Sequence, residues 1–291
     1  MPDQCFFSFD VRVVIERLYV IRPAERREDM KRDTVSLLCD PATHEQLRPL
    51  PQDGSGEIVN GTLVGTESGK EFPVRDGIPL FISDSDVTGL NRQYQQVYDR
   101  MATTYDLSSR ARRFLLGGWP RQVILRDLKV ADTDRVLEVS IGTGFNVSLL
   151  PRRVKYFGLD ISWGMLKRCQ MYMEKLGLDV ELFLGNAESL PFKDDTFDVV
   201  FHIGGINFFN DKVRAIEEMI RVARPGTKIL IGDESARLEG FYSRLPFVGR
   251  NFKGKAELMR PPLELVPQEM KDVKLKDFYG SFYVITFVKP V

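Results

Sequence analysis

The stretch Val136–Asn146 has the clearest pattern of apolar and polar positions: an apolar strand that contains one acid, Glu138, and then breaks into a Gly-x-Gly turn. Apolar residues at 147–150 predict a helix after the turn, so the unit is a strand, a tight turn and a helix. A second apolar strand, Tyr156–Leu159, ends at Asp160. This order of elements indicates an α/β protein with a ligand site where the strands end.

The residue types at this turn narrow the class of ligand. Gly142 and Gly144 lack a Cβ, so the backbone can take a positive φ and approach a ligand closely. Asp160 is placed to hold a ribose diol, and Glu138 suits a cationic ammonium better than a diphosphate. A dinucleotide fingerprint needs a third glycine where this chain has Val147. The pattern therefore favours a ligand with a ribose and an amino-acid head; the alternative is a glycine turn without a ligand.

Further segments follow in order. Residues 183–211 contain a short loop, an acidic turn and the apolar strand Phe197–His202, and Arg221–Asp233 ends a helix at Pro-Gly before another apolar strand. With these segments the chain resembles the class I S-adenosylmethionine-dependent methyltransferases, of the type that includes small-molecule and quinone C-methyltransferases. The resemblance covers about residues 90–235 well and the C-terminal part loosely. It implies an α/β, Rossmann-like fold with a seven-stranded sheet, helices on both faces, and a final antiparallel hairpin in VKLKDFYGSFYVITFVKP.

The resemblance also implies roles for individual residues. Glu138 would hold the methionine ammonium of S-adenosyl-L-methionine, and Asp160 would accept hydrogen bonds from both ribose hydroxyls. The other implied cofactor contacts are Ser140, Gly142 and Gly144 at the turn, Ile161, Met165, Asn186 and Ala187 around the adenine, and His202 near the methyl group; His202 and Tyr105 are the candidate catalytic residues.

Several of these positions have a second interpretation or depart from the family pattern. Asp160 could instead be the N-cap of a helix, because ISWGMLKRCQ looks helical. A lone histidine such as His202 is more often structural. Ser140 replaces the usual glycine, so we expect a negative φ there. Asn186 replaces the usual aspartate, and its amide oxygen can still accept from the adenine amino group.

From about Leu90 the chain shows a helical pattern with one aromatic face, formed by Tyr94, Val97, Tyr98, Met101 and Tyr105. This face indicates either a helix packed on the core or, by the resemblance, a lid that brings Tyr105 near the methyl donor.

Residues 36–82 predict a small unit of short strands, which resembles a zinc-ribbon-like module found in activator proteins of tRNA and protein methyltransferases. The positions that match the four metal-binding cysteines are Cys39, Thr43, Gly65 and Ser68. With His44 the chain offers at most two ligands, whereas zinc needs four, so we expect no metal. Apolar packing is expected to hold the module instead, through Leu37, Leu38, Leu47, Leu63, Val64, Phe72, Val74, Ile78 and Phe81. His44 is otherwise a surface turn residue.

The expected domains are an N-terminal extension at 1–33, the β module at 34–84 and the methyltransferase domain at 90–291. The formal net charge of +0 argues against nucleic acid as a partner. Three widely spaced cysteines indicate a reducing, cytoplasmic location. No apolar run is long enough for a membrane span, and the start of the chain lacks the features of a signal peptide.

The expected function is methyl transfer to a small-molecule or lipid-like acceptor. Two alternatives stay open: an RNA methyltransferase, and a cofactor-binding regulatory protein without turnover. A cluster formed by Arg110, Arg112, Arg113, Arg121 and Arg126 is either a solvated helix face or an attraction for an anionic acceptor.

Overall fold

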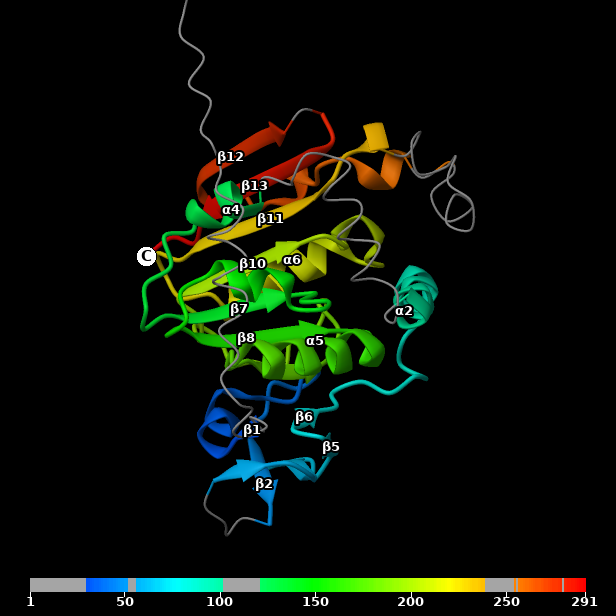
Figure 1. Cartoon of the computed structure of the whole chain (residues 1–291), viewed down its shortest axis with the longest axis vertical. Helices are drawn as coiled ribbons and strands as arrows, with labels where there is room; N and C mark the ends of the chain where they lie inside the picture. Colours follow the sequence, from blue (N-terminus) through cyan, green and yellow to red (C-terminus); the bar gives the residue numbers. More distant parts are fainter. Residues whose placement is uncertain (1–29, 52–55, 102–120, 239–253, 255, 279) are drawn as a thin grey trace, which may run out of the picture.

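A computed structural model describes residues 30–51, 56–101, 121–238, 254, 256–278 and 280–291. Its main element is a seven-stranded sheet with the order β12-β13-β11-β10-β7-β8-β9. The five strands from β9 to β11 are parallel, and β13 is antiparallel to both β11 and β12. Figure 1 shows the sheet with the C-terminal hairpin at one end. The predicted fold class, including this hairpin, is confirmed.

The strands of the sheet are β7 (Arg135–Val139), β8 (Lys155–Asp160), β9 (Glu181–Leu184), β10 (Val199–Ile203), β11 (Lys228–Glu234), β12 (Lys271–Phe278) and β13 (Phe282–Val288). The α-helices are α2 (Gly89–Met101), α4 (Arg121–Arg126), α5 (Trp163–Leu176) and α6 (Lys212–Val222). Short 3-10 helices are η1 (Arg32–Leu37), η2 (Phe145–Leu149), η3 (Ile206–Phe208), η4 (Ala236–Leu238), η5 (Ala256–Met259) and η6 (Leu263–Leu265).

Helices cover both faces of the sheet because successive strand residues point to opposite sides. On β7, Val136 packs in a cluster with α4 and α5, whereas Leu137 packs with α6 in the other cluster. The predicted helix after the glycine turn is shorter than expected: it is the 3-10 helix η2, which ends before Pro151. A residue that precedes proline is driven out of the helical region, which explains the early end.

The N-terminal part forms a four-stranded antiparallel sheet, β2-β4-β5-β6, and a separate two-stranded pair, β1 with β3. These strands are β1 (Met30–Lys31), β2 (Leu47–Leu50), β3 (Glu57–Ile58), β4 (Gly61–Gly65), β5 (Glu71–Arg75) and β6 (Ile78–Pro79). Figure 1 places them beside β8 and β9, at the end of the main sheet opposite β12.

Apolar packing holds this β module, as predicted. Leu38 and Leu63 are fully buried and belong to one cluster with residues of the main sheet and α6. The other predicted packing residues are also buried, except Leu37, which is partly buried. The module and the main sheet therefore share one apolar core, although the expected domain limits stay a prediction.

Candidate cofactor site

Glu138 lies on β7 beside the glycine turn and is 1% exposed. Its Oε1 accepts a hydrogen bond from Asn146 Nδ2 at 2.6 Å, and its Oε2 accepts one from the Tyr156 hydroxyl at 2.5 Å. Burial raises the pKa of the Glu138 carboxyl to about 7, although both hydrogen bonds and the positive charge of Arg121 act in the opposite direction. Glu138 is thus a buried acid whose charge is poised near neutral pH.

Asp160 ends β8, the neighbouring strand, and its carboxylate closes the same turn. Its Oδ2 accepts from the Gly142 amide at 2.8 Å and its Oδ1 from the Ser162 amide at 2.9 Å. Burial raises the pKa of the Asp160 carboxyl to about 6. The N-cap of α5 is Ser162, whose side chain accepts from the Met165 amide. The alternative interpretation of Asp160 as a helix N-cap is therefore wrong.

The turn between β7 and η2 uses the left-handed backbone region three times. Ser140 has a φ of +61°, Gly142 of +58° and Gly144 of +76°. The expectation of a negative φ at Ser140 is wrong, because the backbone must reverse directly after the strand. A Cβ on Gly142 would meet nothing within 4 Å, whereas one on Gly144 would lie 2.6 Å from Cys169 Sγ. Gly144 therefore allows α5 to pack closely, and Gly142 borders open space.

The four residues expected around the adenine come from the segments that follow two strands, with Met165 in the first turn of α5. Ile161 and Met165 follow β8, and Asn186 and Ala187 follow β9. Met165 and Ala187 are buried, while Ile161 and Asn186 are half-buried. The Asn186 side-chain oxygen accepts from the Glu188 amide at 3.0 Å, inside its own turn. The two segments follow adjacent strands, and the Asn186 side-chain oxygen is bonded within its own turn.

His202 lies on β10 and is completely buried. Its Nδ1 is 2.9 Å from the Val139 carbonyl oxygen, and its Nε2 accepts from the Ile206 amide at 2.9 Å. Nδ1 must therefore carry the proton and donate a hydrogen bond to the Val139 carbonyl oxygen. Burial lowers the pKa of the His202 imidazole to about 4. Both nitrogens are engaged by the backbone, an arrangement that favours a structural role over the predicted catalytic one.

A third buried carboxylate shapes the loop after β10. Asp233 on β11 accepts from the amides of Gly205 (3.1 Å) and Asn207 (3.0 Å) through Oδ2, and burial raises its pKa to about 7. The Tyr283 hydroxyl donates to Asn207 Oδ1 at 2.9 Å. The sequence pattern marks Asp233 only as the end of an apolar strand, and its role depends on contacts across the sheet that no local pattern reveals.

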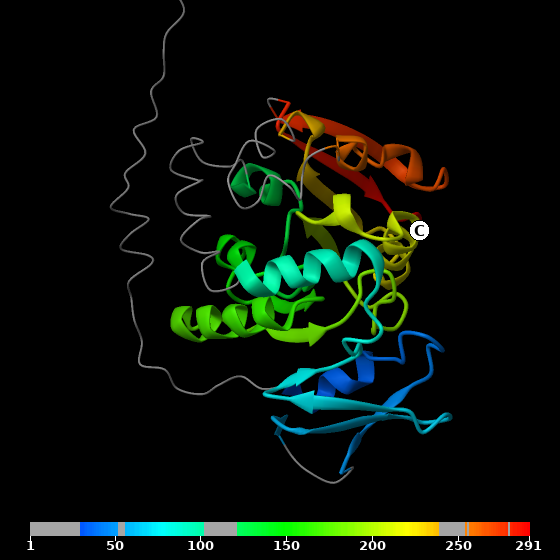
Figure 2. The same ribbon diagram turned by 90° about the vertical axis from the view of Figure 1, so that its right-hand side faces the viewer.

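Helix α2 lies across the end of the sheet and above α5 in the view of Figure 2. Gln95 Nε2 donates to the Ile161 carbonyl at 3.1 Å, and Asp99 Oδ1 accepts from the Gly164 amide at 3.0 Å. Tyr94 stacks on Phe208 with ring centroids 3.9 Å apart. This helix thus contacts the loops after β8 and β10, in agreement with the packed interpretation. The lid interpretation stays a prediction, and Tyr105 lies outside the described residues.

The sequence pattern did not single out Asn146, Tyr156 or Arg121 as parts of this site. Arg121 Nη1 donates to Asn146 Oδ1 at 3.1 Å, so that a continuous chain of hydrogen bonds runs from Arg121 through Asn146 to Glu138. A signal was present for Asn146, a polar residue two positions after Gly144 in an otherwise apolar segment. Tyr156 could be paired with Glu138 only once the register of β7 and β8 was known.

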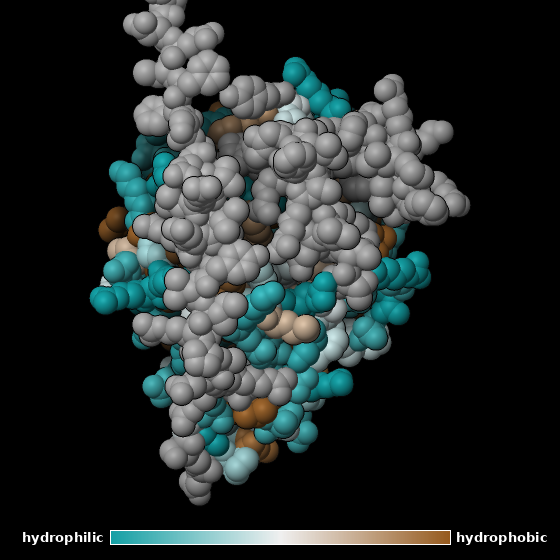
Figure 3. All heavy atoms as spheres, viewed as in Figure 1, coloured by the Kyte–Doolittle hydropathy of each residue, from teal (hydrophilic) through white to brown (hydrophobic). Residues whose placement is uncertain are grey.

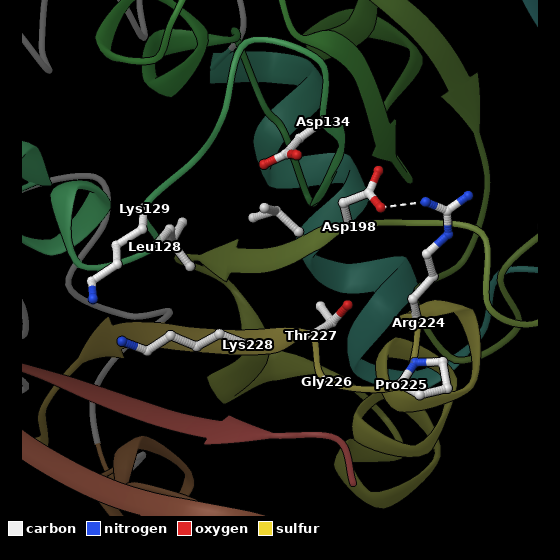
Figure 4. Close-up of a pocket in the computed structure, with 10 residues that line it drawn as sticks. Leu128, Lys129, Asp134, Asp198, Arg224, Pro225, Gly226, Thr227 and Lys228 are labelled. Atoms are coloured by element: carbon white, nitrogen blue, oxygen red, sulfur yellow. Dashed lines mark hydrogen bonds and ion pairs between the residues drawn. The ribbon is translucent and has the colours of Figure 1, made fainter. Parts of the chain in front are cut away.

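A shallow cavity of about 350 Å³ lies at the opposite edge of the sheet, where the strands begin. Figure 4 shows that Lys129, Asp198, Arg224 and Lys228 surround it, with Arg224 paired to Asp198. It is separate from the residues described above.

The face in Figure 3 is mostly hydrophilic over the described residues, and its apolar side chains are scattered in small groups.

Within the described ranges, no three His, Cys, Asp or Glu side chains gather as a metal site would require. His44 is exposed in a turn, as the second interpretation expected, and Cys39 is buried with burial raising its thiol pKa to about 11. None of the helices in the part of the chain that the structure describes could cross a membrane.

Comparisons with known proteins agree with this geometry. Residues 137–231 match the family described as "Methyltransferase domain". The chain is 32% identical over 177 residues to a demethylmenaquinone methyltransferase of Thermotoga maritima, which covers 55% of this chain and 73% of that protein. It is 38% identical over 108 residues to a phosphatidylethanolamine N-methyltransferase of Cereibacter sphaeroides, covering 36% and 53% respectively. The chain spans about half the length of several other curated relatives that it matches.

Among solved structures, phosphoethanolamine N-methyltransferase 2 of Haemonchus contortus in complex with S-adenosyl-L-methionine has a TM-score of 0.52 and 16% identity, over 76% of this chain and 62% of that one. This likeness concerns the fold. The match to the Thermotoga protein extends over 73% of that relative. The chain belongs to the class I S-adenosylmethionine-dependent methyltransferases.

Proposed function

We propose that this protein transfers a methyl group from S-adenosyl-L-methionine to a small-molecule or lipid-like acceptor. One observation carries the proposal: Glu138 and Asp160 end neighbouring strands on either side of a glycine turn whose Gly142 borders open space. Two buried carboxylates at the carboxyl edge of a parallel sheet suit a ligand that has an ammonium at one end and a ribose diol at the other.

The residues present also fit the rest of an amino-acid head. Arg121 begins α4 and is joined to Glu138 through the side chain of Asn146. The positive Arg121 and the acidic Glu138, separated by the Asn146 amide, are complementary in charge to a zwitterion, whose carboxylate and ammonium are attached to one carbon. Glu138 would bind the ammonium, and the planar Arg121 guanidinium would bind the carboxylate with two hydrogen bonds.

The bound cofactor supplies an activated methyl group, which the acceptor takes by in-line displacement at the methyl carbon. The chain's own residues then have to hold the reactants in line and exclude water, which can contribute about 7–11 kcal/mol in favourable cases. Glu138 and Asp160 fix the two ends, while α2 covers the loops after β8 and β10. His202 has no ring nitrogen available for the acceptor's proton.

The acceptor class is proposed from the relatives, whose names include phosphatidylethanolamine, demethylmenaquinone and phthiotriol methyltransferases. That the acceptor is anionic stays a prediction, because Arg110, Arg112 and Arg113 lie outside the described residues. A cytoplasmic location stays a prediction as well.

The test has two stages. Calorimetry should show binding of S-adenosylhomocysteine to the purified chain, and radiolabelled methyl donor should then label a small-molecule or lipid fraction of a cell extract. Labelling confined to RNA would favour the RNA methyltransferase alternative. Binding without labelling of any fraction would favour the regulatory alternative, and absence of binding by the folded protein would contradict the proposal.

The role of Arg121 is tested with S-adenosylhomocysteine and its decarboxylated analogue, which keeps the amine. Arg121→Ala should weaken binding of the first by about tenfold or more, because a charge-assisted contact is lost, and leave the second almost unchanged. Arg126→Ala, an exposed position on the same helix, is the matched control. Equal weakening of both ligands would mean that Arg121 acts through Asn146 and Glu138 instead.

A further inference from the structure

The β module is bound directly to the loop that carries the expected adenine contacts. This loop, 184–193, begins at the end of β9 and contains Asn186 and Ala187. At its start, the Phe81 amide of the module donates to the Leu184 carbonyl at 2.9 Å, and Leu80 forms a parallel bridge with Leu184. The module thereby extends the edge of the main sheet next to the site.

The other end of the loop is bound to a second segment of the module. The Cys39 amide donates to the Pro191 carbonyl at 3.1 Å, and the Lys193 amide donates to the Leu37 carbonyl at 2.9 Å. Two residues before Pro191, the Ser189 hydroxyl donates to the Pro41 carbonyl. Module contacts therefore lie on both sides of the expected adenine contacts, only two or three residues away.

The segment of the module that makes these bonds is itself held by Glu45. The Asp40 amide donates to the Glu45 carbonyl oxygen at 3.0 Å, which closes the turn that contains Pro41. The Glu45 carboxylate accepts from the amides of Glu67 (2.7 Å) and Ser68 (3.0 Å) and from the Ser68 hydroxyl. The Glu45 carboxylate thus joins the turn that contains Pro41 to the turn that contains Glu67 and Ser68.

The position of this carboxylate agrees with the resemblance to metal-binding modules. Gly65 and Ser68 stand where cysteines are expected in those relatives, and a Cβ on Gly65 would lie 2.5 Å from Glu45 Oε1. The Glu45 carboxylate therefore fills the space toward which side chains at these two positions point. The cross-link between the turns is made by hydrogen bonds to an acid.

We propose that the β module positions the adenine-binding loop. Glu45 keeps the turn that contains Pro41 in place, and the hydrogen bond from Ser189 to Pro41 fixes the loop relative to that turn. This inference rests on the proposed function, because it assigns Asn186 and Ala187 to the adenine. The module would then set how well the site distinguishes an adenine from a base without the 6-amino group. Glu45 and Ser189 are positioning residues, since neither touches the cofactor.

The test compares S-adenosylhomocysteine with S-inosylhomocysteine, in which a carbonyl replaces the 6-amino group. The full chain should bind the adenosyl compound more tightly by about tenfold, the scale of one well-made hydrogen bond. In Glu45→Gln and in Ser189→Ala this ratio should fall at least threefold, mainly through weaker binding of the adenosyl compound. Glu67→Gln, an exposed acid of the same turn, should keep the ratio.

Each outcome is decisive because a ratio of two affinities does not follow the fraction of folded protein. An unchanged ratio in both variants, with or without a lower melting temperature, would overturn the inference. A wild-type ratio near one would overturn it as well, while leaving methyl transfer intact. If Glu45→Gln fails to fold, Ser189→Ala alone still tests the contact. Binding of neither compound by the wild type would contradict the proposed function itself, and this inference with it.

Discussion

The ends of β7 and β10 each hold a buried titratable side chain, yet the two side chains have different kinds of partner. Glu138 is bonded by the side chains of Asn146 and Tyr156, so a ligand can take over one of these hydrogen bonds without any change in the backbone. His202 is bonded on both nitrogens by backbone groups of Val139 and Ile206, which cannot leave without unfolding the loop. Burial alone therefore does not identify a binding residue; whether its partners are side chains or backbone groups separates the expected binding role from the structural one.

The sharpest way to test this difference is to remove the histidine. His202→Ala leaves a carbonyl and an amide buried without partners and creates a cavity, so the free energy of unfolding should fall by about 3 kcal/mol or more. Urea denaturation measures this loss, and His44→Ala at an exposed turn is the control. Turnover per folded molecule should stay within a few-fold. A stable variant without turnover would instead give His202 a direct part in the chemistry.

The opposite result is expected for the two acids. Glu138→Gln and Asp160→Asn should each weaken S-adenosylhomocysteine binding by about ten- to hundredfold, because a charge-assisted hydrogen bond contributes about 1.5–3 kcal/mol. The free energy of unfolding should change little in Glu138→Gln, because the Tyr156 hydroxyl can accept from the new amide. It should fall by about 1–3 kcal/mol in Asp160→Asn, because an NH2 group then faces a backbone amide that has lost its acceptor. Calorimetry measures the affinity, with the exposed Glu217→Gln as the matched control. Unchanged affinity in both variants would contradict a binding role for Glu138 and Asp160.

The raised pKa of Glu138, about 7, predicts a pH dependence of binding. The ionised carboxylate binds the ammonium, so the affinity for the ligand should be highest well above pH 7 and should fall as the pH drops below 7. For one group this means about tenfold weaker binding at pH 6 than at pH 8, with a proton released on binding near neutral pH. Calorimetry in buffers of different ionisation enthalpy detects that proton. Glu138→Gln should remove this part of the dependence.

The smallest expected effect concerns the backbone of the turn. Ser140 has a φ of +61°, a conformation that costs a residue with a Cβ about 1 kcal/mol and a glycine nothing. Ser140→Gly should therefore stabilise the protein by about 0.5–1 kcal/mol in thermal or urea unfolding. Ser162→Gly, which removes the N-cap of α5, should act in the opposite direction. Destabilisation by Ser140→Gly would show that the serine hydroxyl makes a contact of greater value than the strain.

The sequence was sufficient to predict the strands that carry Glu138 and Asp160, because their apolar runs and glycine turn are local patterns. The seven-stranded sheet and its hairpin followed from the resemblance and are confirmed. The partners of the buried groups were not predictable in this way. Tyr156 meets Glu138 across two strands, and Asp233 meets the amides of Gly205 and Asn207 from another strand. Such contacts depend on register and loop path, which periodicity does not encode.

Ser140 shows a second limit of local reasoning. Steric rules favour a negative φ for serine, yet the turn requires the left-handed region there, and the surrounding strand and helix impose it. The helix after the turn was overestimated for a related reason: apolar residues at 147–150 continue the pattern, but Pro151 ends η2. The residue-level assignments around the adenine stay predictions.

The two outer strands of the main sheet are protected by different means. The β module covers β9, whose segment ELFL is mostly buried, through Leu80 and Phe81. At the opposite end β12 is almost wholly exposed and carries Lys271, Lys274 and Lys276. Repulsion between lysines discourages a second chain from pairing with β12, whereas a bare β9 would offer an apolar template. Deleting the module should therefore turn a monodisperse solution into one that forms intermolecular β-structure and precipitates.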